Sequence, residues 1–256
     1  MAAYGTLAFE SVLDNAPALK SLETEPWTLP GARLIQASIE VEREPALAAI
    51  PPALHPSLPP YALFAVTEFP ESPVGPFRLA QVRIVTRAGT RPRGFLVGAV
   101  CDSDVAAAEL AARWGYSVVP GEVKLVERHD RWIGTVVRDG ATIMQVTCRD
   151  PQLINGADID LVDTLTLARH ESESLLMQVD PEYVYHAAHR GHAELEFDSA
   201  SWGRGLLAGS VRPTSPNVAV CCRVDTDLPT PRFVIDPAKP ALLGTRRISA
   251  VGEPAD

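Results

Sequence analysis

Lysine is scarce in this sequence of 256 residues, which contains only Lys20, Lys124 and Lys239. Acidic residues outnumber basic ones, 32 to 23, so the formal net charge is -9 at pH 7. Because nucleic-acid binding needs clustered positive charge, this balance argues against a nucleic-acid partner. The densest basic segment, Arg83–Arg93, is interleaved with turn residues. We interpret it as the solvated surface of a hairpin, with attraction of an anionic substrate as the alternative.

Long apolar runs are also missing. No segment of the sequence approaches the roughly 18 apolar residues that a membrane-spanning helix requires. The first residues carry no basic region, and Glu10 comes before any long apolar run, which argues against a signal peptide. We therefore expect a cytoplasmic protein with no membrane partner.

Motifs typical of metal, phosphate and nucleophile sites are absent. There is no HExxH, no glycine-rich phosphate loop and no G-x-S-x-G elbow. His186, His189 and His192 lie three apart, but in a segment that passes into a strand, so their rings should not converge on a metal. The sequence therefore predicts no metal and no other cofactor.

The four cysteines show no C-x-x-C spacing. Cys221 and Cys222 are adjacent in a predicted strand, so their side chains should point to opposite faces and are poorly placed to pair. Free thiols, as in a cytosolic protein, are the prediction for all four. They are Cys101, Cys148, Cys221 and Cys222.

Strand-forming patterns dominate the chain. Three consecutive strands, separated by turn residues, are predicted at Tyr61–Phe69, Phe77–Arg87 and Phe95–Val100. Strands joined this tightly form an antiparallel meander, and one this apolar should be a wall of a barrel or sandwich. A second meander is predicted from three further segments, with Asp139-Gly140 as the hairpin turn between the last two. These segments are Glu122–His129, Arg131–Arg138 and Ala141–Cys148.

One helix is predicted at about Ser103–Trp114, because the segment begins with capping residues and ends before Gly115. A short helix at Pro45–Leu54 should stop at the prolines that follow Ile50. Residues 1–30 should form a loosely attached arm or lid, and the whole chain, 1–256, one domain. The remaining predicted strands are Arg33–Arg43, Gly156–His170, Ser174–Tyr185, Gly191–Phe197, Leu206–Val211, Val218–Val224 and Arg232–Ile235.

Several short motifs follow one another in a defined order along the chain. LHPSLPPY, SPVGPF, RPRGF and LAARWGY with GEV-L close behind lie in the first half, and QVDPEY, RGHAELEF, LPTPRFVIDP and GTR in the second. In this order and spacing, the chain resembles the acetoacetate decarboxylase superfamily over most of its length. The resemblance implies a β-dominated α+β fold with few helices, a closed funnel-like barrel with an apolar cavity, and a homo-oligomer. It does not settle the chemistry, because one fold can host many functions.

Members of that superfamily typically use a lysine Schiff base, assisted by cavity glutamates and an arginine. A lowered lysine pKa makes the free amine nucleophilic at neutral pH. Matching the chain at Tyr116 places Val118 where the family has its nucleophilic lysine. The same matching places Leu79 and Phe64 at the two acid positions. Lys124 is the nearest lysine, and only a shift of the intervening loop would bring it inward; otherwise it is a surface lysine.

Polar candidates for the cavity are few. Glu68 lies four residues after Phe64 on the same strand and should share its facing, as Gln81 should share that of Leu79. Both are candidates for the cavity, with a solvated rim of the barrel as the alternative. Tyr116 matches a cavity aromatic of the family and has a phenol that can donate a hydrogen bond. Arg33 lies near the position of the family's arginine.

The resulting hypothesis is a diverged lyase-like enzyme for a small or medium oxo acid or polyketide-like small-molecule substrate. Its step would be an imine-independent lyase, dehydration or cyclisation reaction of secondary metabolism, with Glu68, Gln81 and Tyr116 as polar groups. A Schiff-base decarboxylase or aldolase that uses Lys124 is one alternative. A non-catalytic barrel that holds an apolar ligand is another.

Overall fold

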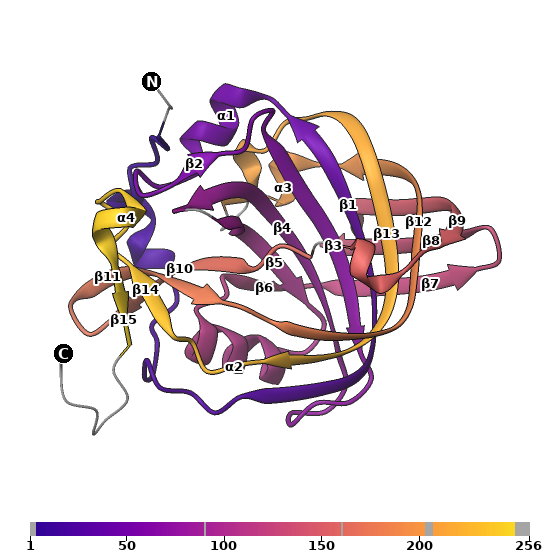
Figure 1. The fold of residues 1–256 in the computed structure, drawn as a ribbon, viewed down its shortest axis with the longest axis horizontal. Helices are drawn as coiled ribbons and strands as arrows, with labels where there is room; N and C mark the ends of the chain where they lie inside the picture. The colour runs from indigo at the N-terminus through magenta and orange to yellow at the C-terminus, as the bar shows by residue number, and fades with distance from the viewer. Residues whose placement is uncertain (1–3, 90, 160, 203–206, 249–256) are drawn as a thin grey trace.

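Figure 1 shows the fold in a computed structural model, which describes residues 4–89, 91–159, 161–202 and 207–248. The strands are β1 (Trp27–Val41), β2 (His55–Pro56), β3 (Tyr61–Phe69), β4 (Phe77–Ala88), β5 (Arg91–Cys101), β6 (Val118–Pro120), β7 (Glu122–Arg128), β8 (Arg131–Arg138), β9 (Ala141–Leu153), β10 (Thr164–His170), β11 (Glu173–Val179), β12 (Glu182–Phe197), β13 (Pro213–Leu228), β14 (Phe233–Ile235) and β15 (Thr245–Arg247). The α-helices are α1 (Arg43–Ala48), α2 (Asp104–Trp114), α3 (Ser199–Trp202) and α4 (Ala241–Gly244), and the 3-10 helices are η1 (Phe9–Asn15), η2 (Gly156–Asp158) and η3 (Leu207–Ser210). Within these described ranges no helix is long and apolar enough to cross a membrane.

The strands form one sheet, which confirms the predicted β-dominated fold with few helices. Their order is β15-β14-β11-β10-β5-β4-β3-β1-β13-β12-β9-β8-β7, with β2 paired to β4 and β6 to β5. Neighbours are antiparallel, except that β10 and β6 run parallel to β5. Because this path has two ends, main-chain hydrogen bonds do not close the described strands into the barrel that the resemblance implied. Figure 1 shows the sheet curving around the core while β7, β8 and β9 extend to one side.

Both predicted meanders are present. β3 has the predicted bounds, β4 ends one residue later than predicted, and β5 begins at Arg91 rather than Phe95 because its polar first residues also pair with β4. The second meander is β7-β8-β9. Its hairpin turn has positive φ at both residues, 51° at Asp139 and 78° at Gly140, as a tight two-residue turn requires.

The predicted helix is α2. The Ser103 side chain accepts a hydrogen bond from the backbone N–H of Ala106, and Gly115 ends the helix with φ 67°. Two apolar side chains of α2, Leu110 and Trp114, are buried against the sheet. The helix therefore covers one face of the strands and helps to form the pocket described below.

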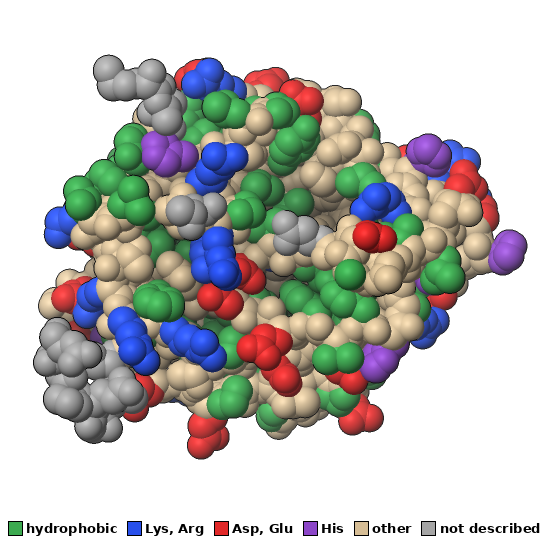
Figure 2. All heavy atoms as spheres, in the orientation of Figure 1, with side chains coloured by type: hydrophobic (Ala, Val, Ile, Leu, Met, Phe, Trp, Pro, Cys, Tyr) green, Lys and Arg blue, Asp and Glu red, His purple; other side chains and the backbone are tan. Residues whose placement is uncertain are grey.

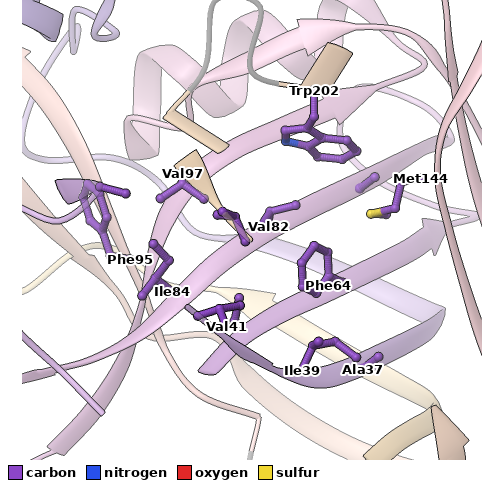
Figure 3. Packing of buried hydrophobic residues seen from close by; sticks show 14 of the residues in the cluster. Ala37, Ile39, Val41, Phe64, Val82, Ile84, Phe95, Val97, Met144 and Trp202 are labelled. Carbon is purple, nitrogen blue, oxygen red and sulfur yellow. The ribbon is translucent and has the colours of Figure 1, made fainter. Parts of the chain in front are cut away.

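Alternation along the strands separates two hydrophobic clusters, one on each face of the sheet. On β4, Ala80, Val82 and Ile84 belong to the first cluster, whereas Leu79 belongs to the second, beside α2. Figure 3 shows part of the first cluster, in which Val82 and Ile84 lie close to residues of neighbouring strands. Polar groups on the face of Leu79 therefore point toward the α2 side of the sheet.

The N-terminal segment is not the loose arm that the sequence suggested. Leu7, Phe9 and Ala16 are buried in the first cluster, and the backbone N–H of Gly5 donates to the carbonyl of Leu54 at 2.9 Å. The prolines of the segment interrupt regular structure, but its apolar side chains still bury themselves against the sheet. Residues 1–3 lie outside the described chain, and β1 already begins at Trp27.

Five other predicted elements differ from the observed ones. α1 is shorter than Pro45–Leu54, and Gly156–His170 contains η2 as well as β10. Ser174–Tyr185 is interrupted at Asp180-Pro181, and β12 continues without a break into the segment predicted as a separate strand. Leu206 lies outside the described residues, and Leu207–Ser210 form η3 rather than a strand. In each case the local pattern fitted a strand or helix, but packing against neighbouring elements decided the bounds.

Candidate active site

A partly enclosed pocket with a volume of about 50 Å³ lies on the face of the sheet that α2 covers. Strands β1, β3, β4, β10, β12 and β13 contribute to its walls, together with α2 and residues of the loops that follow α2, precede β10 and precede β12. Its apolar wall includes Leu34, Phe69, Phe77, Leu79, Leu110 and Leu228. Its polar members are Gln36, Thr67, Gln81, Arg83, Tyr116, Thr164, Tyr183 and Thr226. The site is therefore a small apolar pocket with a few polar groups, as ligand sites commonly are.

Among the described residues of the lining, Arg83 alone carries a full charge at neutral pH, and it is only 5% exposed. Its Nη1 donates to the carbonyl of Val162 and to Thr164 Oγ1, both at 2.9 Å, and its Nη2 donates to Gln36 Oε1 at 2.6 Å. All three acceptors are uncharged, and no ion pair of the described residues includes Arg83. A buried charge that has no counter-ion among the described residues costs several kcal/mol, so these residues favour an anion beside the guanidinium.

Two polar atoms of the lining residues lack partners. A guanidinium has five N–H donors, and three of those of Arg83 are used, which leaves Nε–H and one N–H of Nη2. Arg83 Nε and Thr226 Oγ1 are both buried without a hydrogen bond. Because buried polar groups in folded proteins are normally satisfied, these two atoms are candidates to bind a ligand.

Two tyrosines stand near Arg83. Burial raises the pKa of Tyr116, although the charge of Arg83 and a hydrogen bond with Thr164 oppose the shift. Burial also raises the pKa of Tyr183. Both phenols therefore stay protonated at neutral pH and can serve as hydrogen-bond or proton donors. The described residues of the lining include no Asp, Glu, His, Lys or Cys, so they offer donors and one cation but no base.

Of the residues predicted for the site, Leu79, Gln81 and Tyr116 line the pocket. Val118 begins β6 and packs, partly buried, against the second cluster without lining the pocket. Phe64 lies on the opposite face, in the first cluster, and Figure 3 shows it among Val82, Met144 and Trp202. The expectation that Phe64 lines the cavity is therefore wrong. Alternation along β3 instead points the odd-numbered residues of this strand toward the pocket.

Glu68 shares the facing of Phe64, as predicted, and for that reason it too lies outside the pocket. Its carboxylate accepts from Arg33 Nη2 at 2.6 Å and from Arg78 Nε at 2.8 Å. Burial alone would raise the pKa of Glu68, but the hydrogen bonds and charges of Arg33 and Arg78 together outweigh it and lower the pKa. Arg33 also pairs with Glu127. Arg33 and Glu68 thus belong to an ion-pair network away from the cavity.

No lysine reaches the pocket. Lys124 lies on the edge strand β7 with its side chain 63% exposed, and its Nζ is 3.2 Å from Glu122. The loop shift that would bring it inward has not occurred, because β7 pairs with β8 along its whole length. Lys20 and Lys239 are also exposed and paired with carboxylates. All three lysines of the sequence are therefore at the surface.

Sequence reasoning missed Arg83 as a site residue. Arg83 and Arg93 are buried, which contradicts the interpretation of Arg83–Arg93 as solvated surface, although Arg87 and Arg91 are exposed. On the face shown in Figure 2, basic side chains are interspersed with acidic and apolar ones. The signal was present in the alternation of β4, which places Arg83 on the same face as Leu79 and Gln81.

The histidines of β12 do not assemble into a metal site. His186 pairs with Asp225, its Nε2 2.8 Å from Oδ2. Among the described residues, no group of three or more His, Cys, Asp or Glu side chains is placed to hold a metal ion. The four cysteines are free and buried.

Comparison with known proteins places this geometry in context. The family model described as acetoacetate decarboxylase (ADC) matches residues 15–202. A comparison with curated proteins by sequence gives no match.

Several solved structures share the fold. Acetoacetate decarboxylase from Legionella pneumophila subsp. pneumophila str. Philadelphia 1 is 15% identical with a TM-score of 0.70, covering 82% of this chain and 88% of its own. The enduracididine biosynthesis enzyme MppR complexed with pyruvate is 14% identical with a TM-score of 0.66, covering 90% and 93%. An acetoacetate decarboxylase-like enzyme from Sphingomonas wittichii RW1 is 15% identical with a TM-score of 0.65, covering 96% and 99%. At this identity the likeness concerns the fold.

Proposed function

The chain belongs to the acetoacetate decarboxylase family, and from that premise we propose that it is an imine-independent lyase that decarboxylates a small 3-oxo acid. The observation that carries the proposal is the pocket around Arg83, which combines a buried uncompensated cation with protonated tyrosines and contains no amine. Family members with the same fold include enzymes for oxo-acid chemistry, which supports an enzyme here.

Size favours a short substrate. By the same measure of volume, one water molecule needs about 10–15 Å³, so about 50 Å³ is room for a handful of heavy atoms. An oxo acid of three to five carbons approaches this size, whereas a polyketide-like chain would need the apolar walls to move apart. The positive charge of Arg83 selects the anionic form of the acid.

Decarboxylation suits a pocket that has donors but no base. The bond between C2 and the carboxyl carbon breaks, its electron pair forms the C2–C3 double bond, and the 3-oxo oxygen becomes an enolate oxygen as CO₂ leaves. C2 then takes a proton from the phenol of Tyr116, which regains one from water. Dehydration or cyclisation would begin with removal of a proton at C2, for which the described residues of the lining offer no base.

The residues of the pocket act on the charge that moves during this step. Negative charge leaves the carboxylate and develops on the 3-oxo oxygen, so donors near that oxygen bind the transition state more strongly than the substrate. Arg83 supplies the charge and Tyr116 the hydrogen bond. The apolar wall, with Leu79 and Leu110, excludes water and strengthens both interactions.

The experiment is CO₂ release from a series of 3-oxo acids that begins with acetoacetate. We expect Arg83→Gln to lower kcat/KM by about 10²–10³-fold, as loss of an oxyanion-stabilising donor does. Tyr116→Phe should lower it by about 10–10²-fold. Arg87→Gln is the matched control, because Arg87 is an exposed arginine four residues further along β4, and it should retain full activity.

Two results would contradict the proposal. Full activity of Arg83→Gln would show that the anion is bound elsewhere. A protein that binds short carboxylates through Arg83 but releases no CO₂ from any member of the series would instead be a container for small acids, the alternative from the class of binding proteins.

A further inference from the structure

Gln36 is a buried residue of β1, 6% exposed, and it lies in the wall of the pocket next to Arg83. Its Oε1 accepts the hydrogen bond from Arg83 Nη2 at 2.6 Å. A guanidinium can only donate, so the oxygen of the amide must face Arg83 and the amide nitrogen must face elsewhere. The contact with Arg83 therefore fixes which way the amide of Gln36 points.

The amide nitrogen of Gln36 makes no hydrogen bond to any other described residue, although the side chain is buried. Arg83 retains an unused N–H on Nη2, the same nitrogen that contacts Gln36. Two sets of free donors thus occur side by side in the pocket wall. The amide nitrogen of Gln36 is not among the buried polar atoms that lack a hydrogen bond, so its donors are accessible to a ligand in the pocket.

The neutral amide also keeps the charge of Arg83 available. A carboxylate at position 36 would lie at ion-pair distance from the guanidinium and neutralise it, whereas the amide only orients it. From these contacts we propose that Gln36 is a second ligand-binding residue, which donates its amide N–H to the same small carboxylate or enolate anion that Arg83 neutralises. The inference rests on the proposed function, since it assigns the anion of that site a second contact.

The test measures the binding of sodium propionate by calorimetry. Propionate is a short carboxylate that cannot be decarboxylated by the proposed step. Gln36→Glu should weaken propionate binding at least about tenfold at neutral pH while the melting temperature stays equal or rises, because the new carboxylate pairs with Arg83. Gln36→Met should weaken binding about tenfold through loss of one hydrogen bond to a charged ligand. Gln178→Glu and Gln178→Met are the controls, since Gln178 is a buried glutamine of β11 outside the pocket, and both should keep the parent affinity.

A direct readout separates contact from mere support of Arg83. In a ¹⁵N-labelled protein, the side-chain N–H signals of Gln36, identified by their absence in Gln36→Met, should shift as propionate is added. Signals that stay in place at saturation would overturn the assignment, as would parent affinity in Gln36→Glu. If Arg83→Gln also keeps the parent affinity, the anion site of the proposed function is contradicted. If Arg83→Gln loses propionate binding while the Gln36 variants keep it, only the role of Gln36 is contradicted and the anion site at Arg83 stands.

Discussion

At the scale of single residues, two arginine environments distinguish the pocket from the ion-pair network. Arg83 is buried with uncharged acceptors, whereas Arg33 and Arg78 both face the carboxylate of Glu68. A cation whose charge is already neutralised by a carboxylate gains little by binding a second anion. The ion-pair network of Arg33, Arg78 and Glu68 should therefore contribute to stability rather than to ligand binding. The uncompensated cation of Arg83 is the one that should serve a ligand.

Glu68→Gln should therefore lower stability and leave propionate binding unchanged. Removal of the carboxylate leaves two partly exposed arginines without their partner, and we expect a loss of about 1–2 kcal/mol at neutral pH, discounted for solvent screening. Chemical denaturation gives the stability, and calorimetry the binding. Lower propionate affinity with unchanged stability would connect Glu68 to the pocket after all.

The same variant has a defined pH dependence. The folded-state pKa of Glu68 lies below its ordinary value, because the hydrogen bonds and charges of Arg33 and Arg78 outweigh the opposing effect of burial. The stability that Glu68 contributes is thus present above the unfolded-state pKa and is lost as pH falls through the folded-state pKa. The difference between parent and Glu68→Gln should shrink in acid, and a difference that grows there would contradict this sign.

At the scale of elements, the end of α2 is held by a conformation that only glycine adopts easily. Gly115 has φ 67°, and a Cβ there would lie 2.7 Å from the Cβ of Ala168. Gly140, in the turn between β8 and β9, has φ 78° with nothing within 4 Å of a Cβ. The two glycines therefore share a backbone cost but differ in packing.

This contrast gives a matched pair of substitutions. Gly140→Ala should cost about 1–2 kcal/mol from its left-handed backbone alone. Gly115→Ala should cost at least about 3 kcal/mol, because the new methyl group also collides with β10. Denaturant unfolding measures both, and equal losses would show that the clash at Gly115 relaxes without cost.

How far each element could be predicted depends on where its signal lies. α2 has its signals inside the segment, the Ser103 cap and Gly115, and alternation with bounding turns gave β3 its ends. Leu206–Val211 fitted the pattern of a strand equally well, but residues Leu207–Ser210 form η3. The prediction failed because no local pattern says whether a partner strand is adjacent. The apolar N-terminal residues looked like a loose arm for the same reason, since their burial depends on distant segments.

How far the candidate site could be predicted also depends on whether its signal lies within a local segment. Alternation correctly placed Leu79 and Gln81 on one face, which Arg83 shares, but it does not tell which face holds the cavity. Phe64 was assigned to the cavity through the family match, and Glu68 because it shares the facing of Phe64. The pocket lies on the α2 side of the sheet, which neither residue faces. The burial of Arg83 depends on β1, β10 and the backbone of Val162, and none of these contacts is visible in the sequence around Arg83.

At the scale of the whole molecule, the placement of lysine decides between the two mechanisms. The chain has three lysines, and each is exposed and paired with a carboxylate on the surface. The described residues of the pocket include no amine, because they are apolar residues, amides, hydroxyls and Arg83. A Schiff base with a bound oxo acid would therefore require a large rearrangement of β7.

The most direct measurement is the mass of the intact chain after borohydride reduction during turnover of acetoacetate, under conditions where CO₂ release is recorded in parallel. An imine formed with a lysine during turnover would be reduced to a stable adduct of higher mass. We predict CO₂ release with an unchanged chain mass, and equal activity of Lys124→Ala. An adduct that maps to Lys124, together with loss of activity in Lys124→Ala, would contradict the imine-independent mechanism.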